Sequence, residues 1–145
     1  LPQDIHLVAV GRQTDYVKEL PRNNARLHLL SGISDQQLQA LYQLADVFVY
    51  PSRYEGFGIP VMEAIHSGLP VVACKGSCLE EAGGPDCLYV DADDVEGMAR
   101  AVSSSLRGAE GREERIQRSR EYVKRFEGQD VARQVLSVYE KVLSL

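Results

Sequence analysis

The sequence predicts an α/β protein: a doubly wound parallel sheet with helices on both faces. Three observations lead to this class. Short apolar runs rich in Val, Leu and Ile alternate along the chain with segments of helical periodicity. The runs are continuous rather than alternating in polarity, as expected for strands that are covered on both faces. The order strand, helix, strand implies parallel pairing through crossover helices, which is the arrangement of Rossmann-like domains.

Five apolar runs are predicted to be strands. They span residues 5–10, 26–30, 46–50, 70–74 and 88–90. Ligands of open parallel sheets bind beyond the carboxyl ends of the strands. The loops that leave those ends are therefore expected to share one rim: those at Gly11 and Gly32, and those over residues 51–58 and 75–84.

Five helices are expected around these strands. One opens at Ser34, where Gln37 completes a capping box before an apolar-periodic stretch. Asp93, with Glu96, is expected to cap another that runs to about residue 106. The remaining three are expected over residues 60–66, 111–125 and 129–143.

Length and composition indicate one globular domain of the soluble class. The chain has 145 residues, enough to bury a core, and its 44% apolar and 26% charged residues exclude a disordered class. A net charge of −5 argues against nucleic acid as a partner. No apolar run approaches the roughly 20 residues of a membrane span. Cys74, Cys78 and Cys87 lack disulfide or zinc spacing and are expected to be free thiols in a reducing compartment.

The segment over residues 50–74 carries the most chemistry. It follows the order strand, glycine-rich loop, helix and strand, with Gly56 and Gly58 in the loop and Pro60 in the first helical turn. Free amides at that helix start, together with the helix dipole, would form an anion site that suits a diphosphate.

Two carboxylates flank this predicted anion site. Glu55 lies in the loop, and Glu63 lies about one turn into the helix. A carboxylate repels a diphosphate, so each acid is better suited to accept from neutral hydroxyls: a ribose diol at Glu63 and a sugar hydroxyl at Glu55. The spacing alone leaves an alternative open, in which the two acids only favour the helix dipole.

This segment resembles the signature of the GT-B glycosyltransferases of family 4, a large group of retaining transferases. The family pattern is Pro-Ser-x-x-Glu-Gly-Phe-Gly-x-Pro-x-x-Glu-Ala followed by Gly-x-Pro-Val-Val. The matching residues here are Pro51, Ser52, Glu55, Gly56, Phe57, Gly58, Pro60, Glu63, Ala64, Gly68, Pro70, Val71 and Val72. The resemblance covers nearly the whole chain. It implies the C-terminal, donor-binding half of a GT-B fold.

The resemblance also implies residue roles. Glu55 would contact the donor sugar near the reacting carbon, as a catalytic residue, and Glu63 would bind the ribose hydroxyls. The family's diphosphate lies against the loop and helix start, and its nucleobase lies against the turn after the second strand. The corresponding residues here are Phe57, Gly58 and Ile59 for the diphosphate, and Gly32 and Ile33 for the base. Gly56 would also be a donor-binding residue, since it lets the backbone approach the ligand closely.

A second loop, over residues 75–81, resembles the family's Gly-x-x-x-x-Glu segment beside the sugar and phosphates. It would contribute Lys75, Gly76 and Glu81 to donor binding. Glu80 departs from the pattern, because many relatives have proline there. A second departure lies near Phe126, where many relatives have Phe-Ser-Trp and this chain has no Trp.

The family's phosphate-binding Arg and Lys have no counterpart that fits here. Arg12 and Lys18 are the nearest candidates, but too little chain separates Arg12 from Glu55. We expect the true pair to precede Leu1. Residues 1–145 are then a donor-binding domain truncated at its N-terminal side, with the acceptor domain absent, and this chain alone should be inactive.

Three weaker signals have ordinary structural explanations. Asp91-Ala92-Asp93 is formally an Asp-x-Asp metal motif, but it opens a helix, so capping explains it better and no metal or cofactor is expected. His66 is interpreted as a helix histidine without a catalytic role. A basic run with interleaved acids is expected to form a solvated, ion-paired face, with a membrane-surface patch as the alternative. The run consists of Arg112, Arg115, Arg118, Arg120, Lys124 and Arg125.

Together these observations predict the donor-binding domain of a retaining hexosyltransferase that takes a mannosyl or glucosyl group from a nucleotide-diphosphate sugar. Its expected partners are that donor and an acceptor domain of the same polypeptide, not nucleic acid. We expect a cytoplasmic protein, peripheral to the inner face of the membrane, with any membrane contact made by the missing domain. The alternative is a non-catalytic sugar-nucleotide-binding or interaction module with the same fold.

Overall fold

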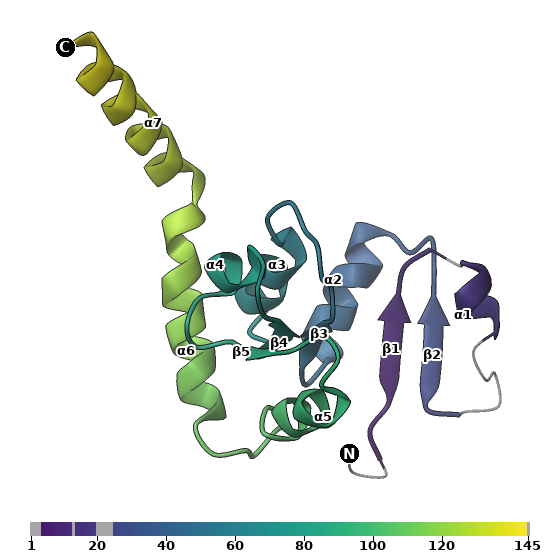
Figure 1. Ribbon diagram of the computed structural model, residues 1–145. Helices are drawn as coiled ribbons and strands as arrows, with labels where there is room; N and C mark the ends of the chain where they lie inside the picture. Colours follow the sequence, from purple (N-terminus) through teal and green to yellow (C-terminus); the bar gives the residue numbers. More distant parts are fainter. Residues whose placement is uncertain (1–3, 13, 20–24, 145) are drawn as a thin grey trace. The chain divides into compact units, whose positions relative to one another are not determined.

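The computed structural model describes residues 4–12, 14–19 and 25–144. The chain divides into two compact units, Leu1–Leu44 and Ala45–Leu145 (Figure 1). Both units contain parallel strands flanked by helices, which confirms the predicted α/β class. Within the described residues the strands form a two-stranded sheet in the first unit and a three-stranded sheet in the second.

The first unit is a strand–helix–strand–helix segment. Strands β1 (Leu7–Val10) and β2 (Leu27–Leu30) pair in parallel, with Leu7 opposite Leu27. The short helix α1 (Asp15–Glu19) lies between them in sequence and was not predicted, because five residues are too few for a periodic signal. Helix α2 (Asp35–Leu44) follows β2.

The predicted capping box at the start of α2 is confirmed. The amide of Ser34 donates to Oε1 of Gln37 at 2.8 Å. In return, the amide of Gln37 donates to Oγ of Ser34 at 3.3 Å. Two amides without helical partners are thereby satisfied, which fixes the helix start.

The second unit is built on strands β3 (Phe48–Tyr50), β4 (Val71–Cys74) and β5 (Leu88–Val90), which pair in parallel in that order. The central strand β4 is buried along its whole length. Its continuous Val-Val-Ala-Cys sequence is therefore explained by cover on both faces.

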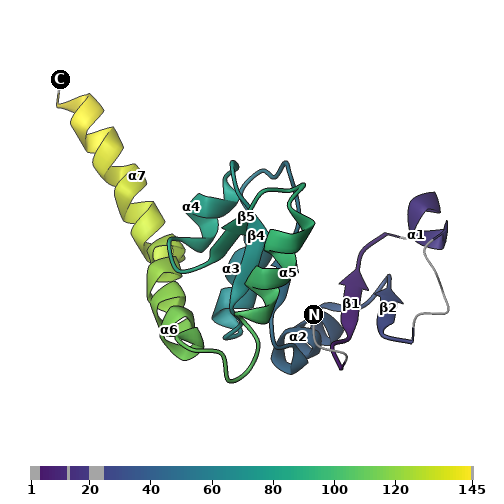
Figure 2. The same ribbon diagram turned by 60° about the horizontal axis from the view of Figure 1, so that its bottom comes forward.

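Four helices lie around this sheet: α3 (Ile59–His66), α4 (Leu79–Gly83), α5 (Val95–Ser103) and α6 (Arg112–Val123). A 3₁₀ turn, η1 (Lys124–Phe126), leads from α6 to α7 (Gly128–Leu143), which packs on η1 and not on the strands. Helix α3 packs against β3 and β4 with α4 and α6 beside it, whereas α5 packs against β4 and β5 (Figure 2). In the described part of the chain, no helix is both long and apolar enough to cross a membrane.

The core lies between β4 and the helices α3, α4 and α6. Its side chains have no more than a few per cent of their surface exposed: Val61, Ala64, Ile65, Val71, Val72, Ala73, Cys74, Leu79, Ala82, Ile116 and Val123. Helix α4 was missed in the sequence, where its residues were assigned to the loop over 75–84. Its five residues bury Leu79 and Ala82 against α3, a burial that is set by tertiary packing and not by periodicity.

The predicted cap of α5 was wrong by one residue. Asp94, not Asp93, is the N-cap, and its side chain accepts from the amide of Gly97 at 2.7 Å. Asp93 instead forms an ion pair with Arg53. Two adjacent aspartates meet the sequence rule for a cap equally well, so a side-chain partner on another loop decides between them.

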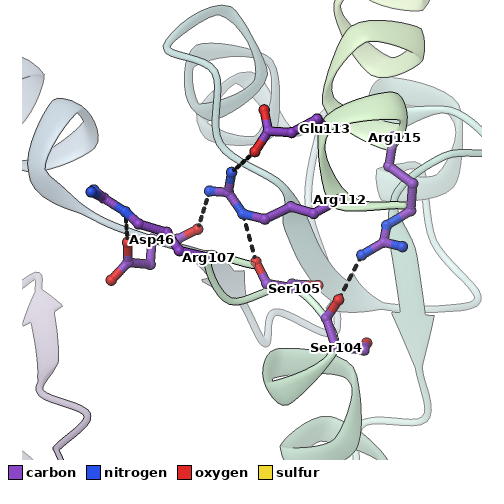
Figure 3. Close-up of polar contacts among 7 residues, drawn as sticks. All are labelled: Asp46, Ser104, Ser105, Arg107, Arg112, Glu113 and Arg115. Carbon is purple, nitrogen blue, oxygen red and sulfur yellow. Dashed lines mark hydrogen bonds and ion pairs between the residues drawn. The ribbon is translucent and has the colours of Figure 1, made fainter. Parts of the chain in front are cut away.

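The basic run in α6 is not simply a solvated face. The side chain of Arg112 is only 10% exposed. Its guanidinium donates to the carbonyls of Ser105 at 3.0 Å and Asp46 at 2.9 Å and also contacts Glu113 (Figure 3). Arg115 donates to the carbonyl of Ser104 at 2.7 Å. These arginines join α6 to the end of α5 and to the start of β3.

Candidate functional site

Two loops meet at the carboxyl-terminal edge of the three-stranded sheet. The loop over residues 51–58 follows β3, and the loop over residues 75–78 follows β4, its neighbour in the sheet. The thiol of Cys78, at the start of α4, donates to the main-chain carbonyl of Glu55 at 3.2 Å. The structure thus brings together the two loops of this unit that the sequence predicted to share a rim.

The start of α3 presents backbone amides. Gly58 is the N-cap, in the left-handed conformation with φ 107°, and no side chain caps the helix. The carbonyl of Gly58 accepts from the amide of Val61 at 3.0 Å. The amides of Phe57, Gly58 and Ile59 have no acceptor among the described residues. With the helix dipole, these three donors are available to an anion, and their contact with a diphosphate stays a prediction.

Gly58 also has no room for a side chain. A Cβ atom there would lie 2.9 Å from Cδ2 of Leu79 and 3.2 Å from Cβ of Ala82. The close approach of loop and α4 thus depends on this glycine. Gly56, in contrast, faces open space, with nothing within 4 Å of a Cβ atom.

Glu55 is exposed in the loop, and protein donors surround its carboxylate. The Tyr50 hydroxyl donates to Oε1 of Glu55 at 2.8 Å. Hydrogen bonding by Ser52, and then by Tyr50, lowers the pKa of the Glu55 carboxyl. Burial and the Glu55 carboxylate raise the pKa of Tyr50 to about 12. At neutral pH the pair therefore consists of a carboxylate and a neutral phenol.

Glu63 lies on α3 and its residue is exposed. Its main-chain carbonyl accepts from the amide of Ser67 at 3.0 Å and from the hydroxyl of Ser67 at 2.8 Å. The position of Glu63 one turn after the start of α3 agrees with the predicted spacing, and its contact with a ribose stays a prediction.

The side chain of Phe57 packs the loop over residues 51–58 against η1. Its ring meets the ring of Phe126 edge to face, with 5.2 Å between centroids and an interplanar angle of 83°. The hydroxyl of Tyr122 donates to the carbonyl of Glu81 at 2.9 Å. The end of α6 and η1 therefore support the loop over residues 51–58 and helix α4.

The second loop is held by acidic side chains. Nζ of Lys75 lies 2.8 Å from Oδ2 of Asp91, and this ion pair raises the pKa of Lys75. Gly76 has φ 81°, and its amide donates to Oε2 of Glu80 at 3.1 Å. Glu80, where this chain departs from the pattern that it resembles, thus closes the turn with its side chain. Glu81 is exposed.

Arg53 was not singled out in the sequence. Both Nη atoms of its guanidinium donate hydrogen bonds to the carboxylate of Asp93. This pairing raises the pKa of Arg53 and lowers the pKa of Asp93. Asp91 is paired with Lys75. Both acids of the Asp-x-Asp sequence are therefore engaged by cations of the two loops. Among the described residues, no group of three His, Cys, Asp or Glu side chains is arranged to hold a metal ion.

The predicted base-binding turn belongs to the first unit. Gly32 is exposed with φ 64°, and Ile33 is half-buried. The positive φ explains the glycine, and the contact of this turn with a nucleobase stays a prediction. Arg12 is exposed, and the side chain of Lys18 lies outside the described residues.

The sequence profile of the family described as "Glycosyl transferases group 1" matches residues 1–107. The chain belongs to this family. Among curated glycosyl transferases it is 32% identical, over 90% of its length, to the O-antigen chain mannosyltransferase B of Escherichia coli. It is 38% identical, over 81% of its length, to the MMP alpha-(1->4)-mannosyltransferase of Mycolicibacterium hassiacum. The chain spans 35% and 30% of these two proteins, about a third of their length.

Solved structures of glycosyltransferases have the same fold. The sucrose-phosphate synthase of Thermosynechococcus elongatus is 27% identical with a TM-score of 0.69, over 83% of this chain and 31% of that one. A glycosyltransferase of Rickettsia africae is 21% identical with a TM-score of 0.80, over 97% of this chain and 40% of that one. The structural neighbours are GT-B glycosyltransferases, so the GT-B fold is established for this chain.

Proposed function

We propose that this chain is the donor-binding domain of a retaining family 4 glycosyltransferase, which transfers a hexose from a nucleotide-diphosphate sugar to an acceptor. One observation carries the proposal: the ionised carboxylate of Glu55 and the amides of Phe57, Gly58 and Ile59, which have no acceptor among the described residues, lie on one five-residue stretch. Free amides beside a charged acceptor would suit a sugar diphosphate, which supports the proposal.

The chemistry follows from this arrangement. The amide cradle and the helix dipole hold the diphosphate and stabilise the negative charge that grows on it as the sugar–oxygen bond breaks. The Glu55 carboxylate favours the positive charge that develops on the sugar ring. Glu63 accepts from the ribose hydroxyls, and Lys75, Gly76 and Glu81 border the sugar and phosphates. Residues Gly32 and Ile33 lie against the base.

The mannosyltransferase names of the relatives favour mannose as the transferred hexose. The acceptor binds to another domain of the same polypeptide, and the protein works in the cytoplasm, peripheral to the inner face of the membrane. No observation favours the alternative of a non-catalytic binding module. A module without activity could dispense with Glu55 and Glu63, and this chain has both acids.

Two substitutions in the complete protein test this function. Glu63→Ala should weaken nucleotide binding roughly tenfold or more in calorimetry, because the ribose diol loses its acceptor. Glu55→Gln should leave nucleotide binding intact but lose turnover, because its charge acts on the sugar. Unchanged nucleotide affinity in Glu63→Ala would refute the ribose role. Turnover of Glu55→Gln within about threefold of the parent would refute the role of the charge.

A further inference from the structure

The bond between Tyr50 and Glu55 joins a rigid donor to an exposed acceptor. Tyr50 is the last residue of β3, where its backbone is in register with Ala73 of the buried strand β4. Its ring stacks on that of Phe48, with 5.6 Å between centroids and an interplanar angle of 20°. Its hydroxyl lies 2.8 Å from Oε1 of Glu55, five residues further along the chain. The sheet therefore determines where the carboxylate of the loop residue is held.

Stability alone does not explain this bond. Glu55 is an exposed residue, and water can satisfy an exposed carboxylate as well as a phenol can. The packing of Tyr50 on Phe48 would be equally available to a phenylalanine. What the hydroxyl adds is a fixed direction for one carboxylate oxygen, while the other lone pairs of Glu55 stay available to a ligand.

The other groups around Glu55 contact it differently from Tyr50. The hydroxyl of Ser52 has a single proton and lies 3.3 Å from the carbonyl of Tyr54, so the carboxylate shares it with the backbone. The thiol of Cys78 binds the main-chain carbonyl of Glu55, not its carboxylate. Arg53, the nearest cation in sequence, is engaged by Asp93. Tyr50 donates directly to Oε1 of the carboxylate at 2.8 Å, beside the contribution of Ser52.

We propose that Tyr50 is a positioning residue for Glu55: its hydroxyl holds Oε1 so that the carboxylate keeps one orientation toward the donor sugar. This inference rests on the proposed role of Glu55 in sugar transfer. Tyr50 belongs to β3 and not to the loop with the Pro-Ser-x-x-Glu pattern, so the inference adds a strand residue to the proposed site.

The first test needs no transferase activity. In this chain, a carbon-detected NMR titration should show the Glu55 carboxyl pKa raised by roughly half a unit or more in Tyr50→Phe, because the carboxylate loses a donor. Tyr54→Phe, which removes a phenol that is 91% exposed on the same loop, should leave this pKa unchanged. An unchanged Glu55 pKa in a folded Tyr50→Phe would overturn the inference.

A reciprocal measurement covers the case in which Tyr50→Phe does not fold. Glu55→Gln removes the charge that helps to raise the pKa of Tyr50 to about 12, so this pKa should fall toward its usual value. A Tyr50 pKa that stays the same in Glu55→Gln would show that the two side chains do not interact in solution, and the inference would be wrong.

The second test separates positioning from a structural role, in the complete protein. Tyr50→Phe should lower kcat roughly tenfold and leave the donor KM within about twofold. In a Glu55→Ala background the same change should cost nothing further, because no carboxylate remains to be positioned. An equal loss of kcat in both backgrounds would overturn the inference. If the pKa values of Tyr50 and Glu55 depend on each other but the complete protein transfers no sugar, the proposed function is refuted and the contact between the two side chains is not.

Discussion

Gly58 stands in a backbone conformation that residues with side chains rarely adopt. With φ 107° and a Cβ position only 2.9 Å from Leu79, alanine there would be strained twice, by its backbone and by the contact with α4. We expect Gly58→Ala to lower the free energy of unfolding by about 2 kcal/mol or more. Gly56→Ala is the matched control, because open space surrounds that position, and it should change stability by less than about 0.5 kcal/mol. Urea unfolding of both variants decides the matter, and equal midpoints would contradict this account.

At the residue scale, the sequence predicted the groups that carry a local signature. Gly58, Pro60 and Glu55 belong to a short, ordered pattern, and the structure places Gly58 and Pro60 at the start of α3 and Glu55 in the loop before it. Tyr50 and Cys78 were missed as partners of Glu55, because nothing in their spacing shows that the phenol contacts the loop or that the thiol reaches it from the start of α4. Such contacts depend on tertiary placement.

Helix α6 shows what charge patterning can and cannot predict. Its alternating arginines and glutamates correctly indicated a helix with ion pairs, as between Arg118 and Glu114. They did not show that Arg112 is buried, because its acceptors lie 7 and 66 residues away in sequence. A cation in such a run can be buried where main-chain carbonyls of a neighbouring segment accept its hydrogen bonds.

We expect Arg112 to be the arginine of α6 on which stability depends most. Arg112→Ala leaves the carbonyls of Ser105 and Asp46 without their donor, and it should lower the free energy of unfolding by about 2–3 kcal/mol. Arg112→Lys should recover only part of this, because an ammonium cannot reach both carbonyls as a planar fork does. Thermal and urea unfolding measure both effects.

The control for this prediction is Arg100 of α5, whose side chain is 70% exposed and lies 3.6 Å from Glu96. Exposed ion pairs of this kind contribute little, so Arg100→Ala should change stability by less than about 0.5 kcal/mol. Similar losses in the two alanine variants would show that the buried position of Arg112 has no special effect.

For the whole molecule, buried titratable groups make stability depend on pH in the alkaline range. Burial raises the pKa of Cys87 to about 11 from an ordinary value of 9.0, and burial also raises the pKa of Tyr89. The folded state therefore keeps a thiol proton that the unfolded state loses first. The contribution of Cys87 is complete below pH 9 and is lost as the pH rises through 11.

This linkage predicts that the free energy of unfolding falls between pH 9 and pH 11, with about 2 kcal/mol of the loss due to Cys87. Urea unfolding at closely spaced pH values, under reducing conditions, measures the slope. Cys87→Ala lowers stability at every pH through the lost packing, but its slope over this interval should be shallower than that of the parent. Parallel slopes would show that the thiol is not the titrating group.

The last expectation concerns the chain on its own: it should bind donor weakly and transfer no sugar. The cations Lys75 and Arg53 at the loop edge are already paired with Asp91 and Asp93, so a diphosphate meets mainly neutral amides and a helix dipole. The chain also spans only about a third of its mannosyltransferase relatives.

We expect affinities from roughly high micromolar to millimolar for UDP and GDP. In an NMR titration, shifts should cluster at residues 55–63 and 75–81, and at residues 32–34 if that turn holds the base. Submicromolar binding, or sugar transfer by these 145 residues, would show that the amide cradle needs no further cations and no second domain.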